Sequence, residues 1–417
     1  MAARCERCGT ALSRYASTIA CPTCRATTAA LPAPPPRLAP AVWMWSDPNA
    51  AAALSTRDLA LIMRAYRRSN HLSQAAVAQI LGYDPSYIAM IEKRKREPGD
   101  IAGRRHIARR LGLPYHLLGV TDPDDGDFAA MVQFGDSVIR LAEIARQSGR
   151  AVEAVNELWP LAARLEARAA EGRLEPDTLL LLASTRLALG VSLGTVLPEE
   201  RLNGAAVWTG KALMVAHHID DSAFLAHTLR MHGNELRKAN RSRAAVARLE
   251  QAVAVSTDPT GRGSALTLLA RAAGEAGRGD EFSAAIDGCR RLLDAGAEHG
   301  ILLNPFTVRE VRARGLLALG EPREALRVLD GDRVGEPAAP QWQVIERVTA
   351  GEVLGASGDR DGASEALLNA VATAENRRLP HQLQRAIRAA EGGGLAAVVG
   401  AGKAALRRLR GLLAPTA

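Results

Sequence analysis

Apolar side chains recur every three or four residues over most of this chain, the spacing that predicts helices packed through one face. Residues 72–98 show the pattern clearly and divide into two short helices. Ser73 is suited to cap the first helix and Gly82 to end it. The inward face of that helix consists of Val77, Ala78 and Leu81.

The second short helix begins at Asp84 and Pro85, an N-cap residue followed by proline at the first helical position. Ile88 and Ile91 are three residues apart and therefore share the inward face. The residues expected to point away from that face are Pro85, Ser86 and Met90. Their face is the one that is available to the base edges of DNA.

This order and spacing resemble the Cro/C1-repressor type of helix-turn-helix, the XRE family. The matching features are a Ser-Gln start, a Leu-Gly end, and then Ser-Tyr-Ile and Ile-Glu. The resemblance covers about residues 55–119, with an opening helix at 55–69 and a closing helix at 101–111. It implies a λ-repressor-like bundle whose second short helix enters the major groove.

The resemblance also implies roles for single residues. Gln74 would hold a phosphate, Glu92 would pair with Arg67, and the outward residues of the second helix would read bases. Arg94 departs from the family, which usually has glycine there, so either the following turn differs or Arg94 adds a phosphate contact. The expected DNA-binding residues are Ser73, Gln74, Pro85, Ser86, Tyr87, Met90, Lys93, Arg94 and Lys95.

Charge supports this interpretation. Residues 55–110 carry 12 Lys and Arg against five Asp and Glu, a net charge of +7, whereas the whole chain carries +8. Such clustering gives salt-sensitive affinity for DNA, because each neutralised phosphate releases a counterion. The basic run at 93–96 would be only a solvated face in isolation, but beside this motif it indicates backbone contact.

Four cysteines near the N-terminus form two Cys-x-x-Cys pairs with twelve residues between them. Cys5, Cys8, Cys21 and Cys24 could supply the four thiolates of a structural zinc ion, and a pair of disulfides is the alternative. A reducing cytoplasm disfavours disulfides. All four zinc positions would be filled by cysteine, so the spacing predicts a small zinc ribbon and no catalytic metal.

Beyond residue 128 the chain repeats itself. Small residues recur at intervals of 40, 40, 40 and 38, at Ala205, Ala245, Ala285, Ala325 and Ala363. The pattern is similar to the tetratricopeptide repeat, although that repeat has a period of 34. It predicts stacked helix pairs that form a superhelix with a concave groove, with the fourth copy degenerate at Asp332.

The groove is expected to hold a peptide, a protein segment or a second copy of the chain. The candidate residues share a helix face or a matching repeat position, and they are Arg230, Asn234, Arg237 and Arg314. A solvated polar face is the alternative. Cys289 occupies a core position of the same register and is expected to be an inert thiol.

These patterns predict an all-α protein in which a helix-turn-helix bundle precedes an α-solenoid. The expected parts are a zinc ribbon at 1–30, a proline-rich linker at 31–54, the DNA-binding bundle at 55–120, an acidic linker at 121–130 and the repeats at 131–417. This combination looks like a regulator common in Streptomyces and related actinobacteria. Relatives of that kind usually dimerise.

No phosphate-binding, dinucleotide, metalloprotease or nucleophile-elbow motif occurs, so an enzyme is not expected. The expected function is a dimeric transcriptional regulator that binds a double-stranded DNA operator. An interaction scaffold or an antitoxin-like protein that is held on nucleic acid remains the alternative. No signal-peptide pattern or apolar run of 18 uncharged residues is present, which favours a cytoplasmic, nucleoid-associated protein without a membrane partner.

Overall fold

The computed structural model describes residues 47–98, 100–120, 128–170, 174–331 and 339–412. Every regular element within these ranges is helical, as the sequence predicts. The four cysteines of the expected zinc ribbon and residues 121–127 of the expected acidic linker lie outside the described residues.

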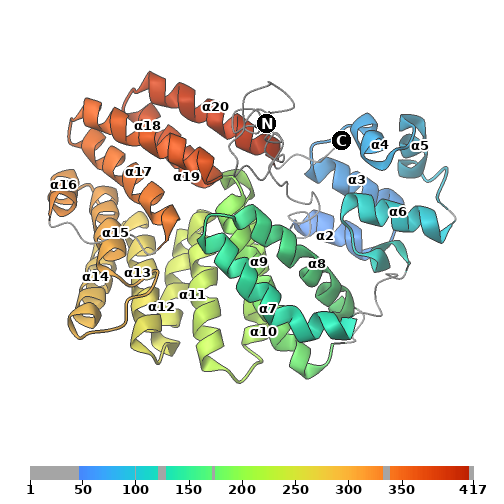
Figure 1. Cartoon of the computed structure of the whole chain (residues 1–417), viewed down its shortest axis with the longest axis horizontal. Helices are drawn as coiled ribbons and strands as arrows, with labels where there is room; N and C mark the ends of the chain where they lie inside the picture. The colour runs from blue at the N-terminus through green and yellow to red at the C-terminus, as the bar shows by residue number, and fades with distance from the viewer. Residues whose placement is uncertain (1–46, 99, 121–127, 171–173, 332–338, 413–417) are drawn as a thin grey trace, which may run out of the picture. The chain divides into compact units, whose positions relative to one another are not determined.

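The first part of the described chain consists of short helices separated by tight turns (Figure 1). Each α-helix in it is capped by an aspartate or a serine whose side chain accepts a backbone N–H of the first turn. The elements are α2 (Pro48–Ser55), α3 (Leu59–Ser69), α4 (Gln74–Leu81), α5 (Pro85–Glu92), α6 (Ile101–Leu111) and the 3-10 helix η2 (Tyr115–Leu118).

The opening helix differs from the expectation of one helix over residues 55–69. The chain instead ends α2 at Ser55 and begins α3 at Leu59. The Asp58 carboxylate accepts the backbone N–H groups of Ala60 and Leu61, at 2.8 and 3.2 Å, so the new helix starts there. Arg57 takes a positive φ of 57° at the junction, which separates the two helices.

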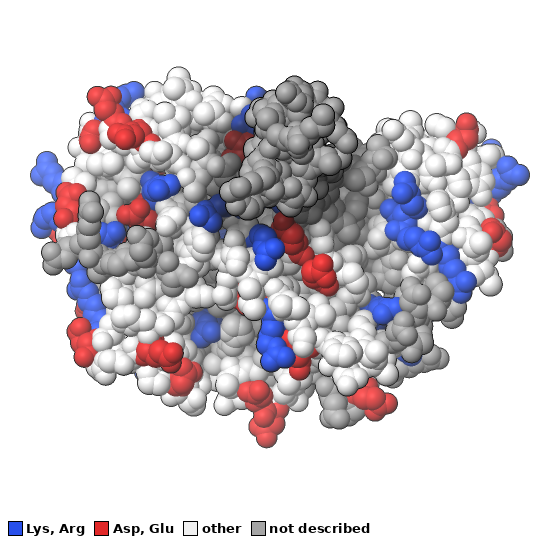
Figure 2. All heavy atoms as spheres, in the orientation of Figure 1, with Lys and Arg blue, Asp and Glu red and all other residues white. Residues whose placement is uncertain are grey.

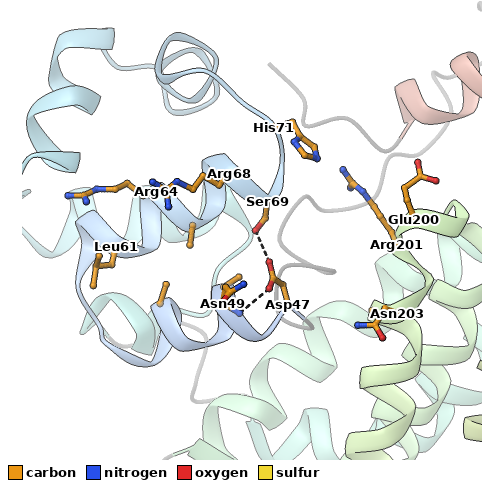
Figure 3. Close-up of a pocket in the computed structure, with 14 residues that line it drawn as sticks. Asp47, Asn49, Leu61, Arg64, Arg68, Ser69, His71, Glu200, Arg201 and Asn203 are labelled. Carbon is orange, nitrogen blue, oxygen red and sulfur yellow. Dashed lines mark hydrogen bonds between the residues drawn. The ribbon is translucent and has the colours of Figure 1, made fainter. Parts of the chain in front are cut away.

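Asp47 ties the beginning and the end of this α2–α3 hairpin together. Its carboxylate accepts the backbone N–H of Asn49 at 2.9 Å and contacts the Ser69 hydroxyl at 3.5 Å (Figure 3). Below the hairpin, large apolar side chains from α3 to α6 form a core in which almost none of their surface is exposed. They include Ile62, Met63, Tyr66, Leu81, Ile88, Ile91, Ile107 and Leu111.

The second part of the described chain is a succession of antiparallel helix pairs (Figure 1). Its helices are α7 (Phe128–Gln147), α8 (Ala151–Ala170), α9 (Pro176–Val196), α10 (Leu202–Ala216), α11 (Ser222–Lys238), α12 (Ser242–Val255), α13 (Pro259–Glu275), α14 (Gly279–Asp294), α15 (Pro305–Ala318), α16 (Pro322–Asp330), α17 (Pro340–Ala356), α18 (Arg360–Asn376), α19 (Pro380–Gly392) and α20 (Ala396–Leu412), with the 3-10 helix η4 (Glu199–Arg201) before α10.

The repeated alanines mark the second helix of successive pairs, from α10 to α18, and all five are buried, at 2% exposure or less. Glycine appears where the two helices of a pair approach closely. A Cβ on Gly233 would lie 2.6 Å from Leu249 Cγ, and one on Gly351 would lie 2.5 Å from Leu367 Cγ. The tetratricopeptide-like pairing predicted from the period is therefore confirmed.

The fourth copy, degenerate in sequence, has a shorter second helix than the others. Its second helix, α16, has nine residues, whereas the matching helices of the other copies have 14 to 17. Gly331 follows α16 directly and takes an extended conformation that ends the helix.

Helix α9 is the one described helix that is long and apolar enough to cross a membrane by length and composition, over Thr178–Val196. About two thirds of that window, 67%, is buried inside the protein. Leu182, Leu189 and Leu193 have at most 2% of their surface exposed. This helix is therefore part of the protein core.

The array curves until its last helices meet α9 and the segment that follows it. Gln384 of α19 accepts the backbone N–H of Glu199 at 2.8 Å and donates to the Glu200 carboxylate at 3.0 Å. Arg410 of α20 pairs with Glu200 at 2.6 Å. These contacts join residues about 185 to 210 positions apart in the sequence and bring α19 beside α9 and η4.

Candidate nucleic-acid interface and repeat-domain cavity

The α4–turn–α5 segment has the local geometry that its sequence predicts. Ser73 caps α4 by accepting the Ala76 N–H at 3.1 Å, and Gly82 ends the helix at a φ of 70°. Asp84 caps α5 by accepting the Ser86 N–H at 2.7 Å, with Pro85 at the first helical position. A left-handed glycine followed closely by an N-cap lets the chain reverse within a few residues.

Helix α5 has the expected inward face, whereas only part of its predicted outward face is exposed. Ile88 and Ile91 are buried, whereas Pro85 and Ser86 are exposed. Tyr87 and Met90 are half-buried, and the Tyr83 and Tyr87 rings meet edge to face with centroids 5.2 Å apart. The N-terminal end of α5 is therefore the most accessible part of the predicted base-reading surface.

Glu92, at the end of α5, ties three helices together. Its carboxylate accepts Arg67 of α3 at 2.8 and 3.1 Å and Gln74 of α4 at 2.8 Å. Arg64 of α3 donates to its backbone carbonyl. Burial raises the pKa of Glu92, but the hydrogen bonds from Arg67 and Gln74 outweigh it and hold that pKa below its usual value.

The geometry thus contains the Arg67–Glu92 pair that the sequence resemblance implies. It also places the Gln74 amide on Glu92. Contact of Gln74 with a phosphate stays a prediction, as do the other expected DNA contacts.

Arg94 stands in the turn after α5 with a φ of 56°, the left-handed conformation that favours glycine. The backbone N–H of Arg94 donates to Ile91 and that of Lys95 to Met90, which closes the helix end. The Arg94 guanidinium donates to the Asp58 carboxylate at 2.6 and 3.1 Å. The turn therefore has the left-handed conformation although its residue is arginine, and the Arg94 side chain forms an ion pair with Asp58, the N-cap residue of α3.

Glycine at position 94 is expected to stabilise the bundle relative to alanine by about 1 kcal/mol, because alanine retains the left-handed strain and glycine does not. Both Arg94→Gly and Arg94→Ala lose the Asp58 pair, so the difference between the two isolates the backbone effect. Urea unfolding of the two variants measures it. Equal stability would show that the turn is not strained.

Basic side chains gather next to these helices. Lys93, Arg94, Lys95 and Arg96 are all exposed. On the face drawn in Figure 2, Lys and Arg form a band over the part of the chain from α3 to α6. Contact of these exposed cations with a phosphate backbone stays a prediction.

The first helices of the repeat pairs line a cavity of about 310 Å³. Its walls come from α7, α9, α11, α13, α17 and α19, together with the segment before α15. Arg230 and Asn234, two of the predicted ligand residues, lie in this wall. The groove expected from the repeat pattern is therefore present as an inner cavity.

The other two predicted ligand residues are engaged with one carboxylate. Arg237 pairs with Glu275 at 2.9 Å, and Arg314 pairs with the same Glu275 at 2.7 Å. Asn234 Oδ1 also accepts from Arg237, at 3.1 and 3.4 Å. The structure thus brings all but Arg230 into one network, and a ligand role for these residues stays a prediction.

Sequence reasoning missed Arg271, Trp342 and Gln382, which also line the cavity. One signal was present for Arg271, since it is the only charged residue in the otherwise apolar and small run at 263–274 of α13. A charged side chain is rarely buried unless it is paired. No group of His, Cys, Asp and Glu within the described ranges is arranged to hold a metal ion.

Comparison with known families finds a helix-turn-helix family model that matches residues 63–101. No curated protein sequence matches the chain. Residues 63–101 therefore match a helix-turn-helix family, and helix pairs of the tetratricopeptide kind follow them.

Solved structures show distant similarity. PlcR of Bacillus thuringiensis, in complex with the peptide PapR7 and DNA, is 15% identical, with coverage of 66% of this chain and 95% of that one and a TM-score of 0.32. A Rap protein in complex with competence and sporulation factor is 13% identical, covers 85% of each chain and has a TM-score of 0.36. The tetratricopeptide domain of P58(IPK) is 12% identical, with coverage of 87% of this chain and 96% of that one and a TM-score of 0.24.

Proposed function

We propose that this chain is a sequence-specific DNA-binding transcriptional regulator of the cytoplasm whose activity changes when a ligand occupies the cavity of its repeat array. The main support is the α4–α5 segment, where the buried Glu92 network fixes three helices while Ser86 and the basic run at 93–96 stay exposed. A rigid support beneath an accessible, basic helix end suits a reader of duplex DNA.

The regulatory half of the proposal is supported by the cavity itself. It lies among the inner helices of an array that has no catalytic motif in its sequence. A ligand there would alter DNA binding only if it binds two shapes of the array with different affinity.

The test is a selection of bound sequences from pooled random double-stranded oligonucleotides. The wild-type chain is run beside Ser86→Glu, which places a negative charge on the exposed start of α5. We expect the wild type to recover a short inverted repeat and the variant to lose it. Recovery of unselected DNA by both proteins would instead favour the scaffold alternative, with nucleic-acid binding only as retention.

We further propose that the chain acts as a homodimer through α7. Phe134, Leu141 and Ile144 lie on one side of this helix and are 61%, 66% and 57% exposed. Exposed apolar residues that share a helix face favour contact with a partner surface. A second copy would also supply the two readers that an inverted-repeat operator requires.

Leu141→Glu is therefore expected to convert the dimer to a monomer, because a charge would be buried at the interface. Sedimentation velocity measures the change. Met214→Glu is the matched control, since Met214 is 69% exposed on α10 and should tolerate the charge without dissociation. A wild-type monomer, or a dimer that survives Leu141→Glu, would contradict the assignment of this face.

We also propose that Cys5, Cys8, Cys21 and Cys24 hold a structural zinc ion, supported by their spacing. The purified chain should contain about one zinc ion per molecule by mass spectrometry, and Cys5→Ser with Cys8→Ser should remove it.

Cys289 provides the control for the zinc prediction. It is fully buried, its Sγ lies 3.4 Å from the Thr267 hydroxyl, and burial raises its pKa to about 11. Cys289→Ala should therefore leave the zinc content unchanged. Two disulfides and no zinc in the protein purified under reducing conditions would refute the metal site.

A further inference from the structure

The wall of the repeat-domain cavity contains buried polar atoms that have no hydrogen-bond partner among the described residues. Besides His381 Nδ1, which lies 3.1 Å from the Glu199 carboxylate, they comprise three N–H donors and one acceptor. These four atoms are Arg230 Nε, Arg271 Nε, Trp342 Nε1 and Gln382 Oε1. Buried polar groups are nearly always paired in native proteins, so a concentration of unpaired donors points to a ligand that carries acceptors.

Arg271 is the centre of this group. Only 6% of its surface is exposed, and no described residue forms a salt bridge with it. The two carboxylates that attract it form no ion pair with it: Glu275 pairs with Arg237 and Arg314, and one oxygen of Glu310 accepts the Thr349 hydroxyl at 2.6 Å. An unpaired buried guanidinium is costly to the ligand-free protein.

Neighbouring charges increase the free-energy cost of burying the Arg271 guanidinium. Burial, and then repulsion from Arg237 and Arg314, holds the pKa of Arg271 well below its usual range, against partial attraction from Glu310 and Glu275. The guanidinium also lies over the Trp342 ring, 5.2 Å from its centroid, which fixes its plane. A bound anion would relieve the repulsion and supply the missing partner.

We propose that this cavity binds a ligand through a carboxylate group, held by Arg271 and by the N–H groups of Trp342 and Arg230. An ionised carboxylate accepts hydrogen bonds only, and an arginine can meet both of its oxygens at once. The regulatory role of this site rests on the function proposed above. Binding of the carboxylate itself requires no DNA.

The other cations of the wall are already engaged. Arg146 pairs with Glu143, and Lys238 pairs with Glu235 at 2.8 Å. Arg230 is held in place, because it donates to the Gly261 carbonyl at 3.2 Å and lies 2.7 Å from His227 Nδ1. Burial, with repulsion from Arg230, lowers the pKa of His227 to about 4, so its imidazole is neutral and accepts that bond at neutral pH.

The rest of the wall limits what the carboxylate is attached to. Leu268, Ile301, Ile345 and Leu379 provide apolar surface around the polar group. A volume of about 310 Å³ lies at the lower end of small-molecule sites. The ligand is therefore a small apolar organic acid or the C-terminal end of an apolar peptide.

The experiment compares carboxylates with their primary amides on the full-length chain. One arm titrates octanoate and indole-3-acetate against octanamide and indole-3-acetamide. The other uses a library of apolar tripeptides with free or amidated C-termini. Isothermal titration and thermal shift are expected to show binding in one arm that needs the free carboxylate, and the arm that responds identifies the source.

Arg271→Met is the decisive variant. Removal of a buried unpaired cation is expected to raise the melting temperature of the ligand-free protein, so lost binding cannot be attributed to unfolding. Carboxylate affinity should fall roughly 30-fold or more. Arg291→Met, an exposed change on α14, is the matched control and should bind as the wild type does.

Equal binding of acids and amides, no binding in either arm, or unchanged affinity in Arg271→Met would each overturn the proposal. The outcome is independent of the DNA assay. A carboxylate that binds without altering operator affinity would support this site and refute the ligand response. Failure to recover an operator sequence would refute the proposed regulatory function and leave the binding result for the cavity unchanged.

Discussion

A chain that carries Lys93→Glu and Lys95→Glu is expected to bind its operator at least ~60-fold more weakly at about 0.1 M salt. Each phosphate contact releases about one counterion and contributes a factor of roughly eight at that salt concentration. Both lysines are exposed beside the end of α5, so their replacement should leave the bundle folded. The negative charges add repulsion to the lost contacts.

The measurement is fluorescence anisotropy on a labelled operator over a series of salt concentrations. The plot of log affinity against log salt should lose about two units of slope, because two phosphate contacts disappear. Arg243→Glu, an exposed charge reversal on α12, serves as the control for net charge. If this control and the double variant weaken binding equally, the basic run does not contact the backbone.

Glu92→Ala is expected to destabilise the helix-turn-helix bundle by about 2 kcal/mol, because it leaves Arg67 and Gln74 without their shared acceptor. Glu92 is only 5% exposed and Arg67 25% exposed, so solvent replaces the lost bonds incompletely. Glu97→Ala breaks the more exposed pair with Arg104 and should cost far less.

Hydrogen exchange of α3, α4 and α5 measures the loss locally, apart from the repeat array. The pH dependence gives a second test. Because the folded protein lowers the pKa of Glu92, its stabilising contribution is complete above the pKa of the unfolded chain and disappears as pH falls through the folded value. The alanine variant should lack this acid-dependent step, and its persistence would show that another carboxylate causes it.

The parts of the fold that local chemistry determines were predictable from the sequence. Ser73, Gly82 and Asp84 fix the boundaries of α4 and α5 through bonds to residues two or three positions away. The recurring alanines marked the repeat helices because each lies at a contact where only a small side chain fits. The break between α2 and α3 was missed, since Arg57 gives no sign of its left-handed conformation.

The cavity was less predictable, because its polar partners come from different repeats. Arg237 and Arg314 are 77 positions apart, yet both reach Glu275 on the helix between them. That carboxylate forms no ion pair with Arg271, which stands four residues before it on α13. A repeat register shows which residues occupy equivalent places, but not how charges from neighbouring copies divide among their partners.

The meeting of α19 and α20 with η4 changes how the array should come apart. A linear stack of repeats has a terminal pair at each end that lacks a neighbour, and unfolding can start there and spread. Here Gln384 and Arg410 contact η4, and Arg378 pairs with Glu153 of α8 at 3.4 Å, so contacts from the last repeats hold the early helices as well. We therefore expect the array to unfold cooperatively, as a closed ring of repeats would, because loss of one helix pair leaves the pairs on both sides of it without a neighbour.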